Sequence, residues 1–570
     1  MKFIIKINGK TYSCNPDQTV LQVAIDNKIE IPHFCYHEDL PIDAHCRTCL
    51  VEVKPEAKIV MSCTLKVKPG LSVLTNSPLV KKLRNENMEL LLAGHKDVCK
   101  NCIRGYACKT FDLMKKFGVT GKKYEHARIP EAVHKMGDAA EFDPHACISC
   151  NKCVEMCQKI GIGFLELEGK GAKSHLTYNK DPKVDCVYCG QCTVHCPVAA
   201  VREQSHLEAV EQILENKEGK VVIAQMAPSV RASIGEEFGL PPGTNLEAQM
   251  YTALRMLGFN KIFDVNMGAD ITTYVEAMEL VERIKKGGPL PMFTSCCPGW
   301  VKYAEFYHPE ILPHLTTARS PQIHSGGAYK TWWADRMRID PRDIIVVSFM
   351  PCTSKKYEAR MKDLKINGVY PVDYVLTTRE IAVLLKKKKI DLPNLESGKV
   401  DKYGEYSGAA AIYGASGGVM ESALRTAHFF LTGKELKKVE FKSVRGMKYL
   451  KKAKVKMGSK TLNVAVCATP KYAAMIIEEL KKNPKAYDYI EVMSCPGGCI
   501  GGGGQPIPST ERIIWERVKS LYKIDDNMQI RSAHQNPIVK DFFENYIAKL
   551  PEKEARAILH RHYEKKEKFE

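Results

Sequence analysis

The sequence predicts several domains, with small cysteine-rich α+β domains first and a larger α/β domain after them. At 570 residues the chain is too long to be organised around one hydrophobic core. Its 22 cysteines come in tight CxxC groups rather than as scattered pairs. From about residue 206, apolar β-branched runs alternate with long amphipathic segments, which indicates buried parallel strands joined by helices.

The composition limits the cellular compartment and the kinds of partner that we expect for this protein. No apolar run approaches the ~20 residues that span a bilayer, and the apolar start of the chain is too short for a signal peptide. In such a chain clustered cysteines favour bound metal over disulfides, so we expect a reduced, cytoplasmic protein. The formal net charge is +18, yet no helix-turn-helix, zinc-finger or RNA-recognition signature points to nucleic acid. The positive charge suits an acidic electron carrier instead.

Residues 1–80 are expected to form a small domain around four cysteines. Apolar residues alternate over positions 3–7, the Asn8-Gly9 pair then favours a hairpin turn, and residues 20–25 suit a helix. A C-x10-C-x2-C-x13-C pattern follows, which suits a 2Fe–2S centre, with zinc as the alternative. The candidate ligands are Cys35, Cys46, Cys49 and Cys63, whereas Cys14 lies outside the set and is expected to be a buried thiol.

Residues 81–125 carry a second candidate metal segment. A helix is expected over residues 79–92, and the pattern H-x3-C-x2-C-x5-C follows it. Taken alone, three cysteines and a histidine can hold either an iron–sulfur cluster or a structural zinc ion. The candidate ligands are His95, Cys99, Cys102 and Cys108.

Residues 126–205 carry the strongest cluster signal. Two runs of the form C-x2-C-x2-C-x3-C follow one another, the duplicated pattern of two-cluster ferredoxins, in which the fourth cysteine of each run binds the other cluster. The first run has Gln158 where a trailing proline is usual, a departure that touches no ligand. One 4Fe–4S cluster is therefore assigned Cys147, Cys150, Cys153 and Cys196, and the other Cys186, Cys189, Cys192 and Cys157.

Residues 206–570 are expected to form the α/β domain. Strands are expected near residues 221–224, 261–265, 343–347, 464–466 and 489–492, and helices over 271–285 and 418–431. Several of these strands run directly into unusual loops. Because ligands bind at the carboxyl ends of parallel strands, we expect the functional site there. Cys467, inside an expected strand, has no partner motif and is expected to be a small core residue.

Three loops together resemble the signature loops of the iron-only (FeFe) hydrogenases. They read TSCCPGW at 294–300, MPCTSKKYE at 350–358 and MSCPGGC at 493–499, with GGGGQP at 501–506. The resemblance covers nearly the whole chain, because the N-terminal cysteine segments resemble accessory domains of the same enzymes and of a cluster-bearing subunit of respiratory complex I. It implies a ubiquitin-like 2Fe–2S domain at 1–80, a 4Fe–4S domain with one histidine and three cysteine ligands at 81–125, a two-cluster ferredoxin domain at 126–205 and a two-lobed α/β catalytic domain at 206–570.

The resemblance also implies a catalytic cofactor, the H-cluster. In the family this is a 4Fe–4S cubane joined to a two-iron subsite that carries carbonyl, cyanide and an azadithiolate bridge. The implied thiolate ligands are Cys297, Cys352, Cys495 and Cys499, the last of which bridges to the two-iron subsite. The implied lining of the pocket around that subsite is Pro228, Ser229, Gln322, Met350, Lys355 and Met493.

A proton route to the cofactor is implied as well. Cys296 adjoins a ligand but is outside the ligand set, so its thiol is the expected proton carrier. The positions that match the family's outward route are Glu276, Thr316, Glu279 and Arg283, with threonine in place of the usual serine. Residues 276, 279 and 283 share one face of an expected helix, although a charged helix face is usually only solvated.

The resulting functional prediction is reversible reduction of protons to dihydrogen. One 2Fe–2S and three accessory 4Fe–4S clusters would relay electrons to or from ferredoxin or another acidic carrier, and maturation proteins would install the two-iron subsite. Two other functions are disfavoured. A non-catalytic electron-transfer subunit would lack the three C-terminal loops, and a hydrogen sensor of this family tends to lack the proton-carrying cysteine. The remaining alternative is the catalytic subunit of an NAD(P)H-linked, electron-bifurcating complex. No GxGxxG or flavin motif is present, so a flavoprotein partner would supply the nicotinamide chemistry.

Overall fold

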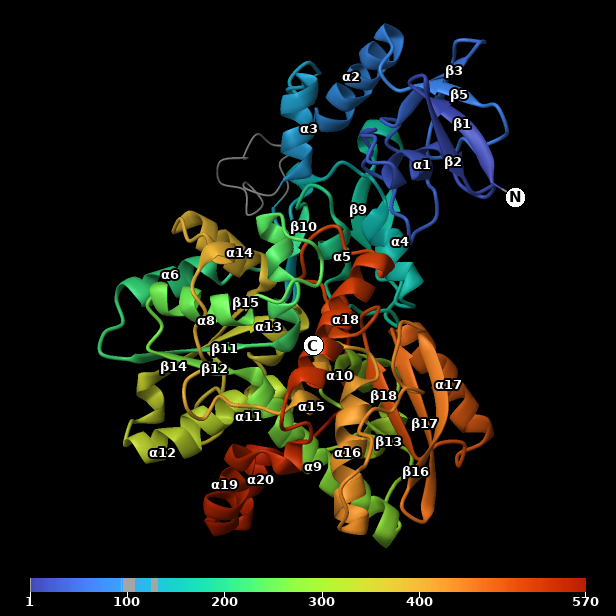
Figure 1. Cartoon of the computed structure of the whole chain (residues 1–570). Helices are drawn as coiled ribbons and strands as arrows, with labels where there is room; N and C mark the ends of the chain where they lie inside the picture. Colours follow the sequence, from blue (N-terminus) through green and yellow to red (C-terminus); the bar gives the residue numbers. More distant parts are fainter. Residues whose placement is uncertain (1, 94, 96–107, 125–131, 570) are drawn as a thin grey trace.

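The computed structural model describes residues 2–93, 95, 108–124 and 132–569. Cys99 and Cys102, two of the predicted ligands, lie outside these residues. Figure 1 shows the N-terminal sheet with helices α2 and α3 at the top and two α/β sheets with their helices below. Within the described residues, no helix is both long and apolar enough to cross a membrane.

Five strands form the N-terminal sheet, in the order β2-β1-β5-β3-β4. Asn8 and Gly9 join the first two strands with φ angles of 52° and 81°, as a tight two-residue hairpin turn requires, so the predicted hairpin is confirmed. The predicted helix is also present as α1 (Val20–Asp26), which begins with a capping box between Thr19 and Gln22. The strands are β1 (Phe3–Ile7), β2 (Lys10–Cys14), β3 (Leu50–Lys54), β4 (Lys58–Met61) and β5 (Ser72–Leu74).

Two helices and a small cysteine-rich region follow. Helix α2 (Pro78–Leu92) matches the expected helix and begins at a Ser77 cap, and α3 is Lys109–Phe117. In the next region helices α4 and α5 pack against each other between a three-stranded sheet and a two-stranded ribbon. These elements are β6 (His134–Met136), β7 (Ala140–Phe142), α4 (Lys152–Lys159), β8 (Leu165–Glu168), β9 (His175–Tyr178), α5 (Gln191–His195) and β10 (Val201–Glu203).

The first α/β sheet is entirely parallel, in the order β12-β11-β14-β15. Both central strands are buried almost throughout, which explains their continuous apolar sequence. They end at Met226 and Met350, so two of the unusual loops begin at the same edge of the sheet. The strands are β11 (Val221–Met226), β12 (Lys261–Asp264), β14 (Ile344–Met350) and β15 (Tyr374–Thr377).

The second sheet has the order β13-β18-β17-β16 and is only partly parallel. β17 (Lys460–Ala468) runs parallel to β18 (Tyr489–Met493), as expected, and the short β13 (Met292–Phe293), which was not expected, is parallel to β18 as well. β16 (Leu450–Met457) is antiparallel to β17 and was not expected from the sequence. It forms a hairpin with β17 through residues 458 and 459, and antiparallel neighbours need only such a short connection.

Helix α9 (Val265–Lys286) lies between the two sheets and contacts both α11 (Pro321–Ala328) and α16 (Gly418–Thr432). It is longer than the expected helix because Asp264, the last residue of β12, caps it directly through the backbone N–H of Asn266. The remaining helices are α6 (Leu207–Glu215), α7 (Pro228–Arg231), α8 (Glu247–Met256), α10 (Pro298–Tyr307), α12 (Ala334–Met337), α13 (Ser354–Glu358), α14 (Thr378–Lys387), α15 (Gly408–Ala411), α17 (Pro470–Lys482), α18 (Glu511–Asn527), α19 (Pro537–Asn545) and α20 (Glu552–Leu559).

Candidate active site and cluster cages

A pocket lies where the loops after β11, β14 and β18 meet helices α9 and α11. Its position at the carboxyl ends of parallel strands is the usual place for a site in an α/β domain. The predicted pocket residues all line it: Pro228, Ser229, Gln322, Met350, Lys355 and Met493. Cys296, Cys352 and Cys499 line it as well, so loops that are far apart in the sequence converge on one space.

Four thiols gather at this pocket. Cys352 and Cys499 line it, and Cys297 and Cys495 are close enough to influence both electrostatically. Burial raises the pKa of Cys352 to about 11, and the neighbouring Cys297 adds to this rise. Because thiolates are unfavourable in such a buried position without a cation, the set is suited to metal binding. Four cysteine thiolates are the donor set of a 4Fe–4S cluster.

The pocket also offers polar groups that the protein leaves unused. Ser229 Oγ and Gln322 Oε1 are buried and have no hydrogen-bond partner among the described residues. A buried polar atom without a partner is costly, so such atoms mark positions where a bound group can supply the missing hydrogen bond. The four thiols and these polar atoms together fit a cofactor with a cluster part and a part that bears polar ligands.

Lys355 brings a positive charge into the pocket. Its Nζ donates to Glu358 Oε2 (2.8 Å) and to the backbone oxygen of Cys296 (3.0 Å). Burial lowers the pKa of Lys355, but the adjacent Glu358 more than offsets this, so its pKa is raised and the ammonium is retained. Ser320 and Gln322 also donate to Glu358 Oε2, which fixes the carboxylate. Sequence reasoning missed Glu358, although its i+3 spacing from Lys355 on α13 is a signal.

The outer end of the predicted proton route is a continuous set of hydrogen bonds. Thr316 Oγ1 donates to Glu279 Oε2 (2.7 Å), and Arg283 Nη2 donates to Glu279 Oε1 (2.5 Å). The threonine hydroxyl therefore makes the contact for which a hydroxyl was expected. Thr317 donates to Glu279 Oε2 as well, from its backbone nitrogen (2.9 Å) and its hydroxyl (3.1 Å).

The inner end of the route is buried and lacks such a continuous set. Glu276 accepts a hydrogen bond from Tyr489 OH (2.6 Å), while its Oε2 has no hydrogen-bond partner among the described residues. Burial, with smaller contributions from the charges of Glu279 and Glu491, raises the pKa of Glu276 to about 8. Burial and the nearby Glu276 raise the pKa of the Cys296 thiol. Sequence reasoning missed Tyr489, because a tyrosine in a buried strand has no signal that separates it from ordinary core.

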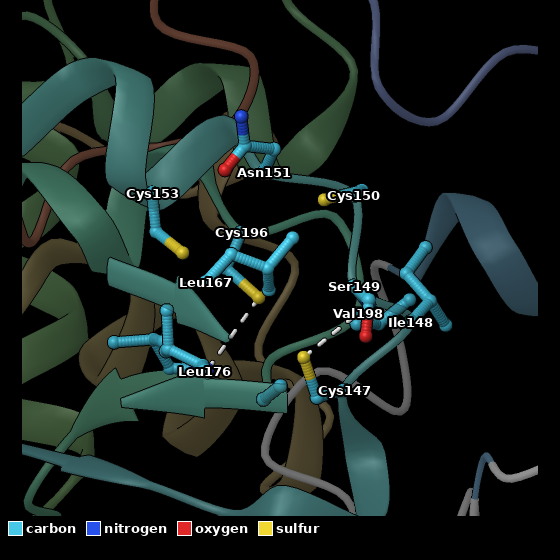
Figure 2. Close-up of a pocket in the computed structure, with 12 residues that line it drawn as sticks. Cys147, Ile148, Ser149, Cys150, Asn151, Cys153, Leu167, Leu176, Cys196 and Val198 are labelled. Atoms are coloured by element: carbon cyan, nitrogen blue, oxygen red, sulfur yellow. Dashed lines mark hydrogen bonds between the residues drawn. The ribbon is translucent and has the colours of Figure 1, made fainter. Parts of the chain in front are cut away.

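Two further pockets are lined by cysteines of the two-cluster region. In Figure 2 the sulfur atoms of the first set surround a pocket whose other lining is mainly apolar; the set is Cys147, Cys150, Cys153 and Cys196. The second pocket is lined by Cys157, Cys186, Cys189 and Cys192. The fourth cysteine of each run thus lies with the first three of the other run, the arrangement that the two-cluster pattern predicts.

The second of these cages is in direct contact with the active-site loop. Cys495 Sγ is 3.9 Å from the backbone oxygen of Cys189. Thr193 on α5 donates to the backbone oxygen of Gly503 (2.6 Å). A side chain on Gly503 would come within 2.5 Å of Gly190, so only glycine allows the two backbones to approach this closely.

The remaining predicted ligands are less completely described. Cys35 and Cys46 have their sulfur atoms 3.4 Å apart, and Cys49 and Cys63 are buried and joined by a hydrogen bond. His95 Nδ1 lies 2.9 Å from the backbone oxygen of Ala146, which leaves Nε2 as the ring nitrogen for a metal. Cys108 is partly buried. Cys14 and Cys467 are both buried, and Cys14 donates to the backbone oxygen of Phe3.

Across the described part of the chain, no three histidine, cysteine or acidic side chains converge tightly enough to hold a single metal ion. A tetrahedral zinc ion brings its ligands to about 2.3 Å from one centre, whereas a polynuclear cluster occupies the space between them. The open pockets between the cysteines of the two-cluster region therefore have the form that clusters need. Together with the buried pocket between the three loops, they fit the class of proteins that bind several iron–sulfur clusters.

Four known protein families match parts of the chain. The "Iron only hydrogenase large subunit, C-terminal domain" matches residues 220–503, and the "Iron hydrogenase small subunit" matches 511–566. A 2Fe–2S cluster-binding domain matches residues 2–78, and a 4Fe–4S dicluster domain matches 146–200.

Whole-chain similarity gives the same assignment. The chain is 40% identical to Iron hydrogenase 1 of Clostridium pasteurianum, across 99% of this chain and 100% of that protein. It is 37% identical to the NADP-reducing hydrogenase subunit HndD of Solidesulfovibrio fructosivorans, across 99% of each. A solved FeFe hydrogenase from Chlamydomonas reinhardtii superimposes with a TM-score of 0.57 at 34% identity, covering 63% of this chain and 99% of that one. The chain belongs to the iron-only hydrogenase family.

Proposed function

We propose that this iron-only hydrogenase reduces protons to dihydrogen, reversibly, at an H-cluster bound by Cys297, Cys352, Cys495 and Cys499. The observation that carries the proposal is the convergence of three distant loops on one buried pocket, with four thiols at one side and unpartnered polar atoms in the lining. The bound cofactor supplies the redox chemistry, and the chain binds it, shields it and moves protons.

Each part of the pocket has its own role in this proposal. The four cysteines hold the cluster, and Met350 and Met493 exclude water from the pocket. Lys355, kept charged by Glu358, provides a cation for an anionic ligand, and Ser229 and Gln322 provide polar contacts. The glycines at 497 and 498 have φ angles of 70° and 94°, which lets the third loop turn tightly beside Cys499.

Protons reach the pocket through side chains of α9 and its neighbours. Cys296 Sγ delivers a proton inside the pocket, and Glu276, oriented by Tyr489, replaces it. The Thr316 hydroxyl and Glu279 carboxylate connect this pair to the outer part of the protein. Glu276 suits the role because a pKa of about 8 lets the carboxyl group gain and lose a proton near neutral pH.

Electrons reach the pocket through the accessory clusters. We assign residues 1–80 to a ubiquitin-like 2Fe–2S domain, 81–125 to a 4Fe–4S domain with one histidine and three cysteine ligands, 126–205 to a two-cluster domain and 206–570 to a two-lobed catalytic domain. The cage that contains Cys189 contacts Cys495, so its cluster is the last relay before the active site. The cage that contains Cys147 is the next one outward.

The electron partner in this proposal is ferredoxin or another acidic carrier, because the chain has a formal net charge of +18. The second candidate is a subunit of a larger NADP-linked complex, favoured by the full-length similarity to a hydrogenase subunit of that kind. Stable co-purification with a flavoprotein would select the second. Dedicated maturation proteins install the two-iron subsite, and the thiolate-rich chain suits a reducing cytoplasm.

The proposed activity is tested by infrared spectroscopy of anaerobically purified, matured protein. We expect bands of metal-bound carbonyl and cyanide, and hydrogen evolution from a reduced dye. A full set of iron–sulfur clusters without these bands, despite competent maturation, would reduce the protein to an electron-transfer scaffold and overturn the proposal.

The crossed ligand sets give a separate prediction. Cys157→Ala and Cys192→Ala should remove the same reduced-cluster signal in electron paramagnetic resonance, because both residues line one cage. Cys196→Ala and Cys153→Ala should remove the other signal. Each variant should lose about four iron atoms. The crossed assignment would be contradicted if Cys157→Ala and Cys153→Ala removed one signal while Cys192→Ala and Cys196→Ala removed the other.

Glu276 gives a prediction about pH. Its folded-state pKa of about 8 lies above the ordinary value of 4.5, so the folded chain keeps a proton there that an unfolded chain releases. Relative to Glu276→Gln, the native chain should therefore lose stability as the pH rises from 4.5 toward 8, and no further above that. The direct measurement is the infrared band of a protonated carboxyl group, which should vanish above about pH 8. The band should be absent at every pH in Glu276→Gln and should persist in Glu279→Gln; a band insensitive to Glu276→Gln would contradict the assignment.

A further inference from the structure

The last part of the chain returns to the proton route. Residues 559–563, called here the C-terminal strap, lie along residues 316–319. The backbone nitrogen of Arg561 donates to the oxygen of Thr317 (2.8 Å), and that of Arg319 donates to the oxygen of Leu559 (3.1 Å). These bonds hold the strap against the segment that carries both threonines beside Glu279.

Side chains of the strap reach the same segment. Tyr563 OH donates to the backbone oxygen of Thr316 (2.7 Å). His560 Nδ1 lies 2.8 Å from Thr317 Oγ1, and that hydroxyl donates to Glu279 Oε2 (3.1 Å). A hydroxyl has only one proton to donate, and here it is used on the carboxylate, so the Nδ1–H of His560 is the donor to Thr317. Imidazole, hydroxyl and carboxylate therefore form one hydrogen-bonded line.

Arg283, the other group at the outer end of the route, cannot exchange protons as a histidine can. Arg283 donates to Glu279, but a guanidinium stays protonated in proteins and holds its partner rather than passing a proton. Histidine is the side chain that gains and loses a proton near neutral pH. His560 is partly exposed, so it has access to water as well as to Thr317.

We propose that His560 exchanges protons between water and Glu279 through the Thr317 hydroxyl, and that Arg283 only positions Glu279. This inference rests on the proposed function. Neutral His560 takes a proton at Nε2, its Nδ1 proton passes to Thr317 Oγ1, and the original hydroxyl proton passes to Glu279 Oε2. His560 is neutral again, the hydroxyl still carries one proton, Glu279 has become a carboxylic acid, and no electron has moved. Exchange of the ring protons with water, loss at Nε2 and uptake at Nδ1, restores the starting tautomer, and the reverse sequence exports a proton.

The charges around His560 agree with this role. Burial lowers its pKa, Glu279 raises it, and the positive charges of Arg556 and Arg319 lower it further. The net direction is downward from the ordinary 6.5, so the ring is neutral at neutral pH and able to accept a proton. His324 is near enough to interact electrostatically with His560, and Arg319 Nε donates to the backbone oxygen of His560 (2.9 Å).

The first test measures the electrostatic coupling between His560 and Glu279 and does not depend on hydrogen turnover. The full-length protein is labelled at its histidine ring carbons, and the signal of His560 among the 17 histidines is assigned by its loss in His560→Gln. Its pKa is then measured by nuclear magnetic resonance in the native chain and in Glu279→Gln. Because Glu279 raises the pKa of His560, we expect a lower value in the variant. An unchanged pKa would overturn the inference even if the protein proves to be a hydrogenase.

The second test separates proton transfer from anchoring of the strap. His560→Gln retains a hydrogen-bond donor for Thr317 but cannot titrate. We expect its hydrogen evolution to fall about 10-fold to 100-fold, with an altered pH profile, and added imidazole to restore activity in His560→Ala. The matched control is His562→Gln, because His562 lies two residues away and is exposed. A normal rate and pH profile in His560→Gln would overturn the inference. If neither the native protein nor any variant evolves hydrogen, the proposed function fails. The change in the pKa of His560 in Glu279→Gln still shows whether His560 and Glu279 interact.

Discussion

Replacing Cys296 by alanine is expected to lower hydrogen evolution by about 100-fold to 10,000-fold, the range in which positioned proton donors contribute to catalysis. Cys296 lines the active-site pocket, is 7% exposed and lies beside the buried carboxyl group of Glu276. In the proposal it binds no iron, so the infrared bands and the iron content should remain. The measurement combines hydrogen evolution from a reduced dye with infrared spectra of the same sample.

The control for this variant is another buried thiol. Cys467 lies in β17, is fully buried and is expected to be only a core residue. Cys467→Ala should keep both the infrared bands and the turnover rate, at the cost of a small loss of packing. If Cys296→Ala evolves hydrogen at the native rate, the proton route through Cys296 is wrong. If it loses iron, Cys296 is a ligand rather than a proton carrier.

Lys355→Met is expected to prevent stable binding of the two-iron subsite and to destabilise the protein. The Lys355–Glu358 pair is buried, with side chains that are 9% and 1% exposed. Breaking a buried ion pair costs about 3–5 kcal/mol, because it leaves one charge without its partner. In the pocket it also removes the cation proposed for an anionic ligand. We therefore expect loss of the carbonyl and cyanide bands together with a lower unfolding temperature.

The next residue provides a matched control. Lys356 forms a fully buried ion pair with Glu380, with Nζ and Oε2 2.9 Å apart, and does not line the pocket. Lys356→Met should lower the unfolding temperature in the same way but keep the infrared bands in the protein that remains folded. Equal loss of the bands in both variants would attribute the effect to unfolding and not to the pocket. Retention of the bands in Lys355→Met would contradict the proposed role.

Local patterns in the sequence predicted much of the fold. The Asn8-Gly9 hairpin, helices α1 and α2 and the buried strands β11, β14 and β18 all follow from turn chemistry and hydrophobic period, which act over a few residues. Strand β16 was missed because its alternation of buried residues with lysines makes it weakly apolar. Its place in the sheet depends on pairing with β17, which is a tertiary contact.

The residues of the site also divide into those that local sequence patterns predicted and those that depend on tertiary contacts. Cysteine spacing encodes which thiols share a cage, because the ligands lie close together in the chain and the pattern repeats. Tyr489 and Thr317 act through hydrogen bonds to carboxylates on another element, Glu276 and Glu279 of α9. No composition or spacing marks these two contacts, since tyrosine and threonine are common in buried strands and loops. The packing of the sheets and helices brings them to the site. Glu358 differs, because its i+3 spacing from Lys355 is a signal in the sequence.

The close approach of Gly190 and Gly503 has a consequence for how the domains can be exchanged. Neither glycine has room for a side chain, and hydrogen bonds from Gln191 and Thr193 to residues 501 and 503 join the same two backbones. The two-cluster region is therefore a fixed part of the wall behind the third loop and not an interchangeable adaptor. A chimaera that takes its ferredoxin-like region from another protein would have to import the matching glycine-rich loop with it.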